Sequence, residues 1–128
     1  MPTDETRGSH PQKPSTCHVV HEDQVGELHL TRESAESLLA SDRFFWIDID
    51  QPTEDDFAVL RDVFRFHPLA LEDSEQFGQR PKLDDYDDFV FLVVYGAVPD
   101  DDRLVEVHCF YSQRFLITVH RDDAPAFT

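Results

Sequence analysis

The stretch that decides the fold is residues 44–73, FFWIDIDQPTEDDFAVLRDVFRFHPLALED, in which one apolar pattern gives way to another. Its first six residues are nearly all apolar, which is typical of a strand covered on both faces. From Phe57 onward, apolar side chains recur at helical spacing, which indicates an amphipathic helix. The stretch therefore predicts a strand packed under a helix, as in α/β folds.

Helix-start signals divide this stretch further. Thr53 can cap a helix over 54–66, whose first turn holds three acidic residues that the helix dipole favours. Pro68 suits the first position of a second, short helix, because the N–H that proline lacks has no helical partner there. We expect this helix to run to about Gln76, with Gly78 available to end it.

The flanking regions supply one further helix and most of the expected strands. Thr31 can cap a helix that ends at Ala40, and the second half of the chain alternates apolar runs with polar turns. This order predicts a mixed sheet with helices on one or both faces, and with Trp46 and the phenylalanines in the core. Besides 44–49, the expected strands are 17–21, 25–30, 83–86, 89–98, 104–111 and 115–120.

Length and charge limit what the chain can be. Its 128 residues suit one domain, and 40% of them are hydrophobic, which is enough to build a core. We expect residues 1–16, which are polar and rich in proline, to form a flexible tail, and residues 17–128 to form the domain. A net charge of −16 argues against nucleic acid and against an anionic membrane surface, because both attract Lys and Arg.

Two further features bear on the location of the chain. The longest apolar run, Phe89 to Val98, has about half of the roughly 20 residues that a membrane helix needs. We therefore expect a soluble chain without direct membrane contact. Cys17 and Cys109 make no disulfide framework: they are either two reduced thiols, which fits a cytosolic setting, or a single bridge.

Four motifs, in order, resemble the N-terminal domain of CorA magnesium transporters. Residues 46–49, Trp-Ile-Asp-Ile, match its Trp-hydrophobic-Asp/Asn strand, and residues 67–73, His-Pro-Leu-Ala-Leu-Glu-Asp, match its His-Pro-Leu-x-x-Glu-Asp segment. Residues 79–84, Gln-Arg-Pro-Lys-Leu-Asp, follow at the expected distance, and the strand 115–120 closes the match. The likeness is good from Phe45 to His120 and poor over the first 40 residues.

The resemblance implies a fold and an assembly. The fold is an α/β/α sandwich with a mixed, partly antiparallel sheet. Family members are homopentamers whose soluble domains lie at the cytoplasmic face of the cell membrane. There a stalk helix and two transmembrane helices follow the domain, with a Gly-Met-Asn motif at the pore mouth. Met1 is the single methionine in these 128 residues, so they do not contain that motif, and we expect them not to transport ions by themselves.

The resemblance also implies a metal site. By position, Asp73 first and Glu72 second correspond to the acidic pair that binds regulatory Mg2+ between subunits in the family. Mg2+ prefers carboxylate and water oxygens. A divalent ion between facing carboxylates turns repulsion into a bridge that holds the pore closed. Co2+, Ni2+ or Zn2+ are alternatives to Mg2+, and the pair can also be ordinary solvated helix residues.

Other charged and ligating residues have plainer interpretations. The acidic patches at 84–88 and 100–102 lack the pattern of a Ca2+ loop and are read as solvated surface. Zinc is disfavoured because neighbours in a strand point to opposite faces. His67 is read as a helix cap, and Arg80 and Lys82 are expected to pair with acids such as Asp84 or Glu75. The zinc candidates are Cys17, His18 and His21, or His108 and Cys109.

Two other functions compete with a regulatory domain. If the gene ends at Thr128, the chain can be a free-standing soluble metal-binding or protein-interaction domain derived from this family. A small hydrolase using His67 is the third hypothesis. The sequence has no nucleophile motif, phosphate loop or His-Glu-x-x-His helix, so we do not expect an enzyme.

Overall fold

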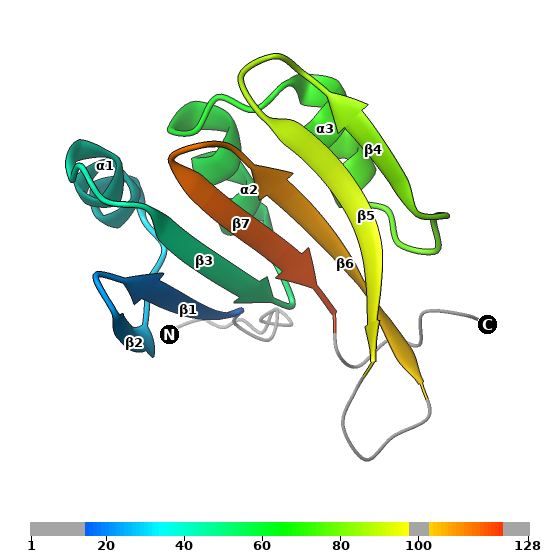
Figure 1. Cartoon of the computed structure of the whole chain (residues 1–128), viewed down its shortest axis with the longest axis horizontal. Helices are drawn as coiled ribbons and strands as arrows, with labels where there is room; N and C mark the ends of the chain where they lie inside the picture. The colour runs from blue at the N-terminus through cyan, green and yellow to red at the C-terminus, as the bar shows by residue number, and fades with distance from the viewer. Residues whose placement is uncertain (1–14, 98–102, 122–128) are drawn as a thin grey trace, which may run out of the picture.

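The computed structural model describes residues 15–97 and 103–121, which form one mixed sheet and three helices (Figure 1). The sheet has seven strands in the order β2-β1-β3-β7-β6-β5-β4. Neighbouring strands β3 and β7 run parallel, and the other neighbouring pairs run antiparallel. The predicted mixed, partly antiparallel sheet is confirmed. The strands are β1 Thr16–His21, β2 Gln24–Glu27, β3 Phe45–Asp50, β4 Lys82–Asp85, β5 Val90–Ala97, β6 Leu104–Tyr111 and β7 Phe115–His120; the helices are α1 Arg32–Ala40, α2 Glu54–Asp62 and α3 Pro68–Ser74.

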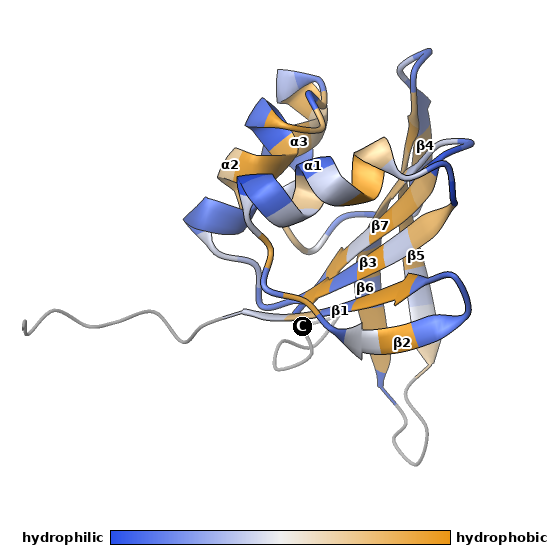
Figure 2. Cartoon of the chain, turned by 90° about the vertical axis from the view of Figure 1, so that its left-hand side faces the viewer, coloured by the Kyte–Doolittle hydropathy of each residue, from blue (hydrophilic) through white to orange (hydrophobic). Residues whose placement is uncertain are grey.

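All three helices lie on the same face of the sheet (Figure 2). The core sits between them and the sheet. Phe66, which follows α2, stacks on Phe110 of β6 with 4.3 Å between ring centroids and also contacts Phe89. The resemblance implies an α/β/α sandwich. The part of the chain that the structure describes contains the sheet and one of the two helical layers of that sandwich.

The prediction that residues 44–49 are covered on both faces is wrong for this arrangement. Side chains alternate along β3, so Phe45, Ile47 and Ile49 are buried against the helices while Trp46 points to the opposite face and is 41% exposed. Phe44 is 49% exposed. Neither residue belongs to the core, because no described helix covers that face.

Local signals placed the helix starts correctly. Thr31 and Thr53 cap α1 and α2, and each accepts a hydrogen bond from the backbone N–H three residues ahead. His67 caps α3: its Nδ1 accepts a hydrogen bond from the N–H of Leu69 at 3.1 Å, as predicted. Such caps satisfy backbone donors that have no partner within the helix.

The helix ends were predicted less well. Helix α2 ends at Asp62 and could not have continued to Phe66, because Arg65 has a φ of 60°, which an α-helix does not allow. This change of chain direction places the side chain of Phe66 in the core. Helix α3 ends at Ser74, two residues before the expected end, and Gly78 has a φ of 97° in the connection that follows.

Strand boundaries agree closely in the second half of the chain. The strands expected at 104–111 and 115–120 are found there, whereas the second strand ends at Glu27 and not at residue 30. Thr16 already belongs to β1, although it was assigned to the tail. Residues 1–14 of the expected tail and the acidic patch at 100–102 lie outside the described residues.

Candidate functional site

Helix α3 carries both candidate metal ligands at the surface. Ala70, Leu71 and Ser74 are buried toward the sheet, which turns the remaining side chains of this short helix outward. Glu72 is exposed and Asp73 is about one-third exposed. The structure thus places the two predicted ligands where an ion can reach them.

Asp73 is held by an ammonium group from the edge strand. Lys82 Nζ lies 2.7 Å from Asp73 Oδ2 and 3.1 Å from Asp84 Oδ2. The hydrogen bond that Lys82 donates to Asp73, more than any other contact, raises the pKa of Lys82. The predicted pairing of Lys82 with Asp84 is confirmed. The additional pairing with Asp73 was not predicted, because it depends on how α3 lies against β4.

Glu72 faces a different neighbourhood from Asp73. It lines a groove of about 490 Å³ between α2 and α3, together with Glu54 and Glu75. Arg61 also lines this groove, but its guanidinium is paired with Asp62 at 2.8 Å. The two predicted ligands are therefore neighbours in sequence whose side chains lie beside different groups.

A buried glutamate and histidine lie behind α3. His108 is 0% exposed and Glu106 is 3% exposed, and His108 Nε2 lies 2.6 Å from Glu106 Oε2. His108 Nδ1 donates to the carbonyl oxygen of Ser74 at 3.0 Å, since that oxygen can only accept. The ring of Phe77 stacks on His108 at 4.2 Å. The pair therefore ties the last residue of α3 to strand β6.

The same glutamate fixes the turn after α3. Glu106 Oε1 accepts hydrogen bonds from the backbone N–H groups of Gly78, at 2.6 Å, and Gln79, at 3.3 Å. The side chain of Gln79 in turn donates to the carbonyl oxygens of Asp73, at 2.7 Å, and Gln76, at 2.6 Å. The sequence indicated that Glu106 and His108, two residues apart on one strand, lie on the same face of the sheet. It did not indicate that this pair contacts α3 and the turn after it.

The zinc candidates are not brought together. Cys17 is buried on the helix side of β1 while His18 points to the open side, and His108 and Cys109 lie on opposite faces of β6. Burial raises the pKa of both Cys17 and Cys109 to about 11, which keeps these free thiols protonated. Within residues 15–97 and 103–121, no three His, Cys, Asp or Glu side chains form a group that could hold a metal.

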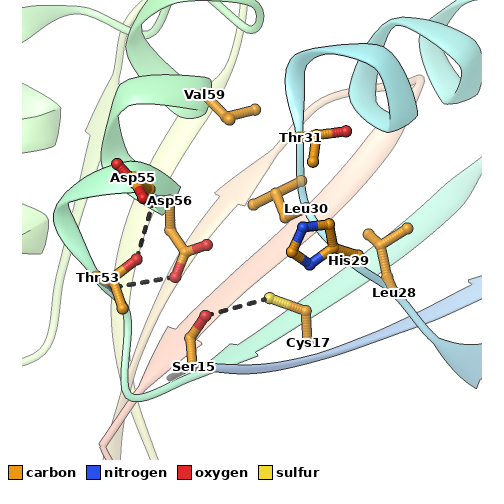
Figure 3. Close-up of a pocket in the computed structure, with 10 residues that line it drawn as sticks. All are labelled: Ser15, Cys17, Leu28, His29, Leu30, Thr31, Thr53, Asp55, Asp56 and Val59. Atoms are coloured by element: carbon orange, nitrogen blue, oxygen red, sulfur yellow. Dashed lines mark hydrogen bonds between the residues drawn. The ribbon is translucent and has the colours of Figure 1, made fainter. Parts of the chain in front are cut away.

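A recess of about 580 Å³ opens between β1, the start of α1 and the start of α2 (Figure 3). Asp56, 5% exposed, is its most buried carboxylate, and its Oδ2 accepts a hydrogen bond from the N–H of Thr53 at 2.9 Å. Thr53 and Asp56 together cap α2. The polar groups on this side of the recess therefore serve the helix start, and we assign no ligand to it.

The sequence of residues 41–128 identifies the family to which the chain belongs. Residues 41–128, more than half of the chain, match the family described as CorA-like Mg2+ transporter protein. The chain belongs to the CorA family. This is a family of transporters and not of enzymes. None of the helices within the described residues has the length and apolar character needed to span a membrane.

Two relatives of this CorA-family chain are named as metal ion transporters. YfjQ of Bacillus subtilis is 40% identical over 82 residues, which are 64% of this chain and 26% of that protein. A protein of Schizosaccharomyces pombe is 28% identical over 117 residues, which are 88% of this chain and 18% of that protein. The chain thus spans about a quarter or less of the length of these relatives.

Solved structures support the same fold. The complete CorA magnesium transporter of Methanocaldococcus jannaschii superimposes with a TM-score of 0.57 at 14% identity, covering 88% of this chain and 34% of that one. The full-length CmaX protein gives a TM-score of 0.60 at 15% identity, covering 88% and 37%. The soluble domain of the M. jannaschii CorA gives 0.54 at 13% identity, covering 82% and 40%. The α/β fold of the chain is therefore that of the CorA soluble domain.

Proposed function

We propose that this chain is the regulatory and assembly domain of a CorA-like divalent-ion transporter, and that Asp73 and Glu72 bind Mg2+ between neighbouring subunits of a homopentamer. The observation that carries the proposal is the position of the two carboxylates. They stand at the surface on a helix whose opposite side is fixed by the buried Glu106–His108 pair. A ligand pair on a rigid support can transmit a change at the surface to the rest of the domain.

The chemistry of the pair suits Mg2+ better than a soft metal. Mg2+ is commonly bound by one or two carboxylates while several of its waters are retained. Zinc would favour nitrogen and sulfur ligands, but Cys17 is buried on strand β1 and Cys109, which is half-buried, lies on the face of β6 opposite to His108 and α3. Co2+ and Ni2+ remain alternative ions for the same oxygen ligands.

The proposed switch follows from electrostatics between copies. Carboxylates that face each other across a subunit boundary repel when the boundary holds no cation. Bound Mg2+ stabilises the packed arrangement, and loss of the ion favours separation of the subunits. An ion shifts such an equilibrium only by as much as it prefers one of the two states. We assign this domain to the cytoplasmic face of the membrane, where it would respond to the internal Mg2+ concentration.

Ion titration of the full-length transporter in liposomes tests the proposal. We expect flux through the wild type to stop as internal Mg2+ rises, and Asp73→Ala to require a higher concentration for closure. Glu72→Ala should shift closure in the same direction by less, since Glu72 is the second ligand. Arg43→Ala, on a distant exposed side chain, is the control. Identical closure curves for wild type and Asp73→Ala would remove Asp73 from the mechanism.

A further inference from the structure

The ammonium group of Lys82 lies beside Asp73 Oδ2, where a metal ion bound to that oxygen would also have to lie. Lys82 Nζ lies 2.7 Å from Asp73 Oδ2 and 3.1 Å from Asp84 Oδ2, so one cation already bridges two carboxylates. It also lies 5.7 Å from the centre of the Phe91 ring. The three charged side chains are each between 31% and 41% exposed, so the bridge remains open to solvent on one side.

Strand geometry holds this arrangement in place. Lys82 and Asp84 are two residues apart on β4, which places both side chains on the face that looks toward α3. Pairing of β4 with β5 sets Asp84 opposite Phe91 and Lys82 opposite Val93. Asp73 approaches from α3. The two carboxylates are therefore held near each other by different elements, with the lysine between them.

A divalent ion and an ammonium group cannot share these oxygens without cost. A lysine ammonium is a compact point charge, and two positive groups a few ångströms apart repel. Mg2+ can reach Asp73 Oδ2 only if Lys82 moves away. When Lys82 leaves, Asp84 loses its partner as well, and both carboxylates become available to the same ion.

We propose that Lys82 is a tethered cation that Mg2+ must displace from Asp73, and that Asp84 then joins Asp73 as a ligand. This inference rests on the proposed function of Asp73 and adds to it a competitor and a further ligand. The competition weakens binding of the ion. A weakened site responds in a higher range of Mg2+ concentration than two free carboxylates would.

Isothermal titration calorimetry of the 128-residue chain with Mg2+, at constant ionic strength, tests this idea. We expect Lys82→Met to bind Mg2+ about tenfold more tightly than the wild type, because a nearby unit positive charge is removed. Lys82→Arg keeps the charge and should bind as the wild type does. Arg80→Met changes the net charge equally on an exposed neighbour and is the matched control. Adding Asp84→Asn to Lys82→Met should reverse most of the gain.

The outcomes separate this inference from the proposed function. If Asp73→Asn weakens Mg2+ binding but Lys82→Met does not strengthen it, the displacement idea is wrong and the Asp73 site stands. If Arg80→Met strengthens binding as much as Lys82→Met, the gain reflects net charge and the idea is also wrong. If the wild type binds Mg2+ with no dependence on Asp73, the proposed function itself fails.

A second measurement uses the unaltered chain. Lys13 is the only other lysine in the sequence and serves as an internal reference for acetylation by acetic anhydride, read by mass spectrometry. We expect Mg2+ to increase acetylation of Lys82 relative to Lys13 several-fold, because displacement frees its amine. An unchanged ratio at Mg2+ concentrations that saturate the Asp73 site would overturn the proposal.

Discussion

Two pairs of hydrogen-bonded polar side chains flank α3, and they differ chiefly in their access to water. On the inner side, the side chains of His108 and Glu106 are 0% and 2% exposed. On the outer side, those of Lys82 and Asp73 are 33% and 31% exposed. A buried pair cannot exchange a partner without leaving a polar group unpaired in a medium of low polarity, whereas a partner in a surface pair can be replaced by water or by another ion. The inner pair therefore fixes the helix, and the outer pair is suited to exchange.

The largest expected effect comes from breaking the inner pair. His108→Leu keeps most of the side-chain volume but leaves Glu106 without its histidine partner and Ser74 O without a donor. Loss of one member of a buried pair costs about 3–5 kcal/mol of unfolding free energy. Urea denaturation followed by circular dichroism measures this cost. Asp62→Asn, which breaks the exposed pair with Arg61, should leave the denaturation midpoint unchanged. Equal midpoints for His108→Leu and the wild type would contradict the assigned role.

A pair of intermediate exposure lies on the open face of the sheet and should give an intermediate effect. His120 Nε2 lies 2.9 Å from both carboxylate oxygens of Asp48, and Thr118 Oγ1 donates to Oδ1 at 2.6 Å. Burial by itself raises the pKa of Asp48, but these hydrogen bonds outweigh it and hold the pKa below its ordinary value. Asp48→Asn should cost about 1 kcal/mol at neutral pH.

The sign of that effect can be tested with pH. A carboxyl group whose pKa is lower in the folded state stabilises the fold above its unfolded pKa of about 4, and the contribution is lost as pH falls through the folded pKa. The stability difference between wild type and Asp48→Asn should therefore be full at pH 7 and shrink below about pH 4. A difference that does not change with pH would show that the ionised form of Asp48 contributes nothing.

The smallest expected effect belongs to the outer pair. Lys82→Met should change the free energy of unfolding by less than about 1 kcal/mol, because partly exposed ion pairs contribute little. The raised pKa of Lys82 places its contribution below the unfolded pKa of about 10.4, so it is present at pH 7 and lost as pH rises through the folded value. Urea denaturation at pH 7 measures the first, and denaturation well above the unfolded pKa of about 10.4 measures the second. If Lys82→Met lowered the free energy of unfolding at pH 7 as much as His108→Leu does, Lys82 would be a structural residue. The inner and outer pairs would then not differ in their contribution to stability.

The sequence was sufficient where a structural feature depends on neighbouring residues. The caps at Thr31, Thr53 and His67 follow from side chains that bond to the backbone two or three residues ahead, so local reasoning finds them. The strands β6 and β7 were placed to the residue because apolar runs are bounded there by polar turns. The family resemblance added the positions of Glu72 and Asp73 but not their surroundings.

The sequence failed where a feature depends on distant parts of the chain. Exposure of Trp46 depends on which face of the sheet the helices cover, and an apolar run alone does not encode that. The meeting of Asp73 with Lys82 requires α3 to lie beside β4. The partnership of Glu106 and His108 with the end of α3 joins residues about 30 apart. In each case the missing information was the packing of one element against another.

The strand order has a consequence for how copies of the molecule can meet. The two edge strands, β2 and β4, are each only four residues long, and β4 has the sequence Lys-Leu-Asp-Asp. Short edges and charged edge residues both discourage a foreign strand from adding to a sheet. Copies of this domain should therefore associate through side chains on their helices or on the open sheet face, and not by extending one continuous hydrogen-bonded ladder, which is the route that leads to insoluble aggregates.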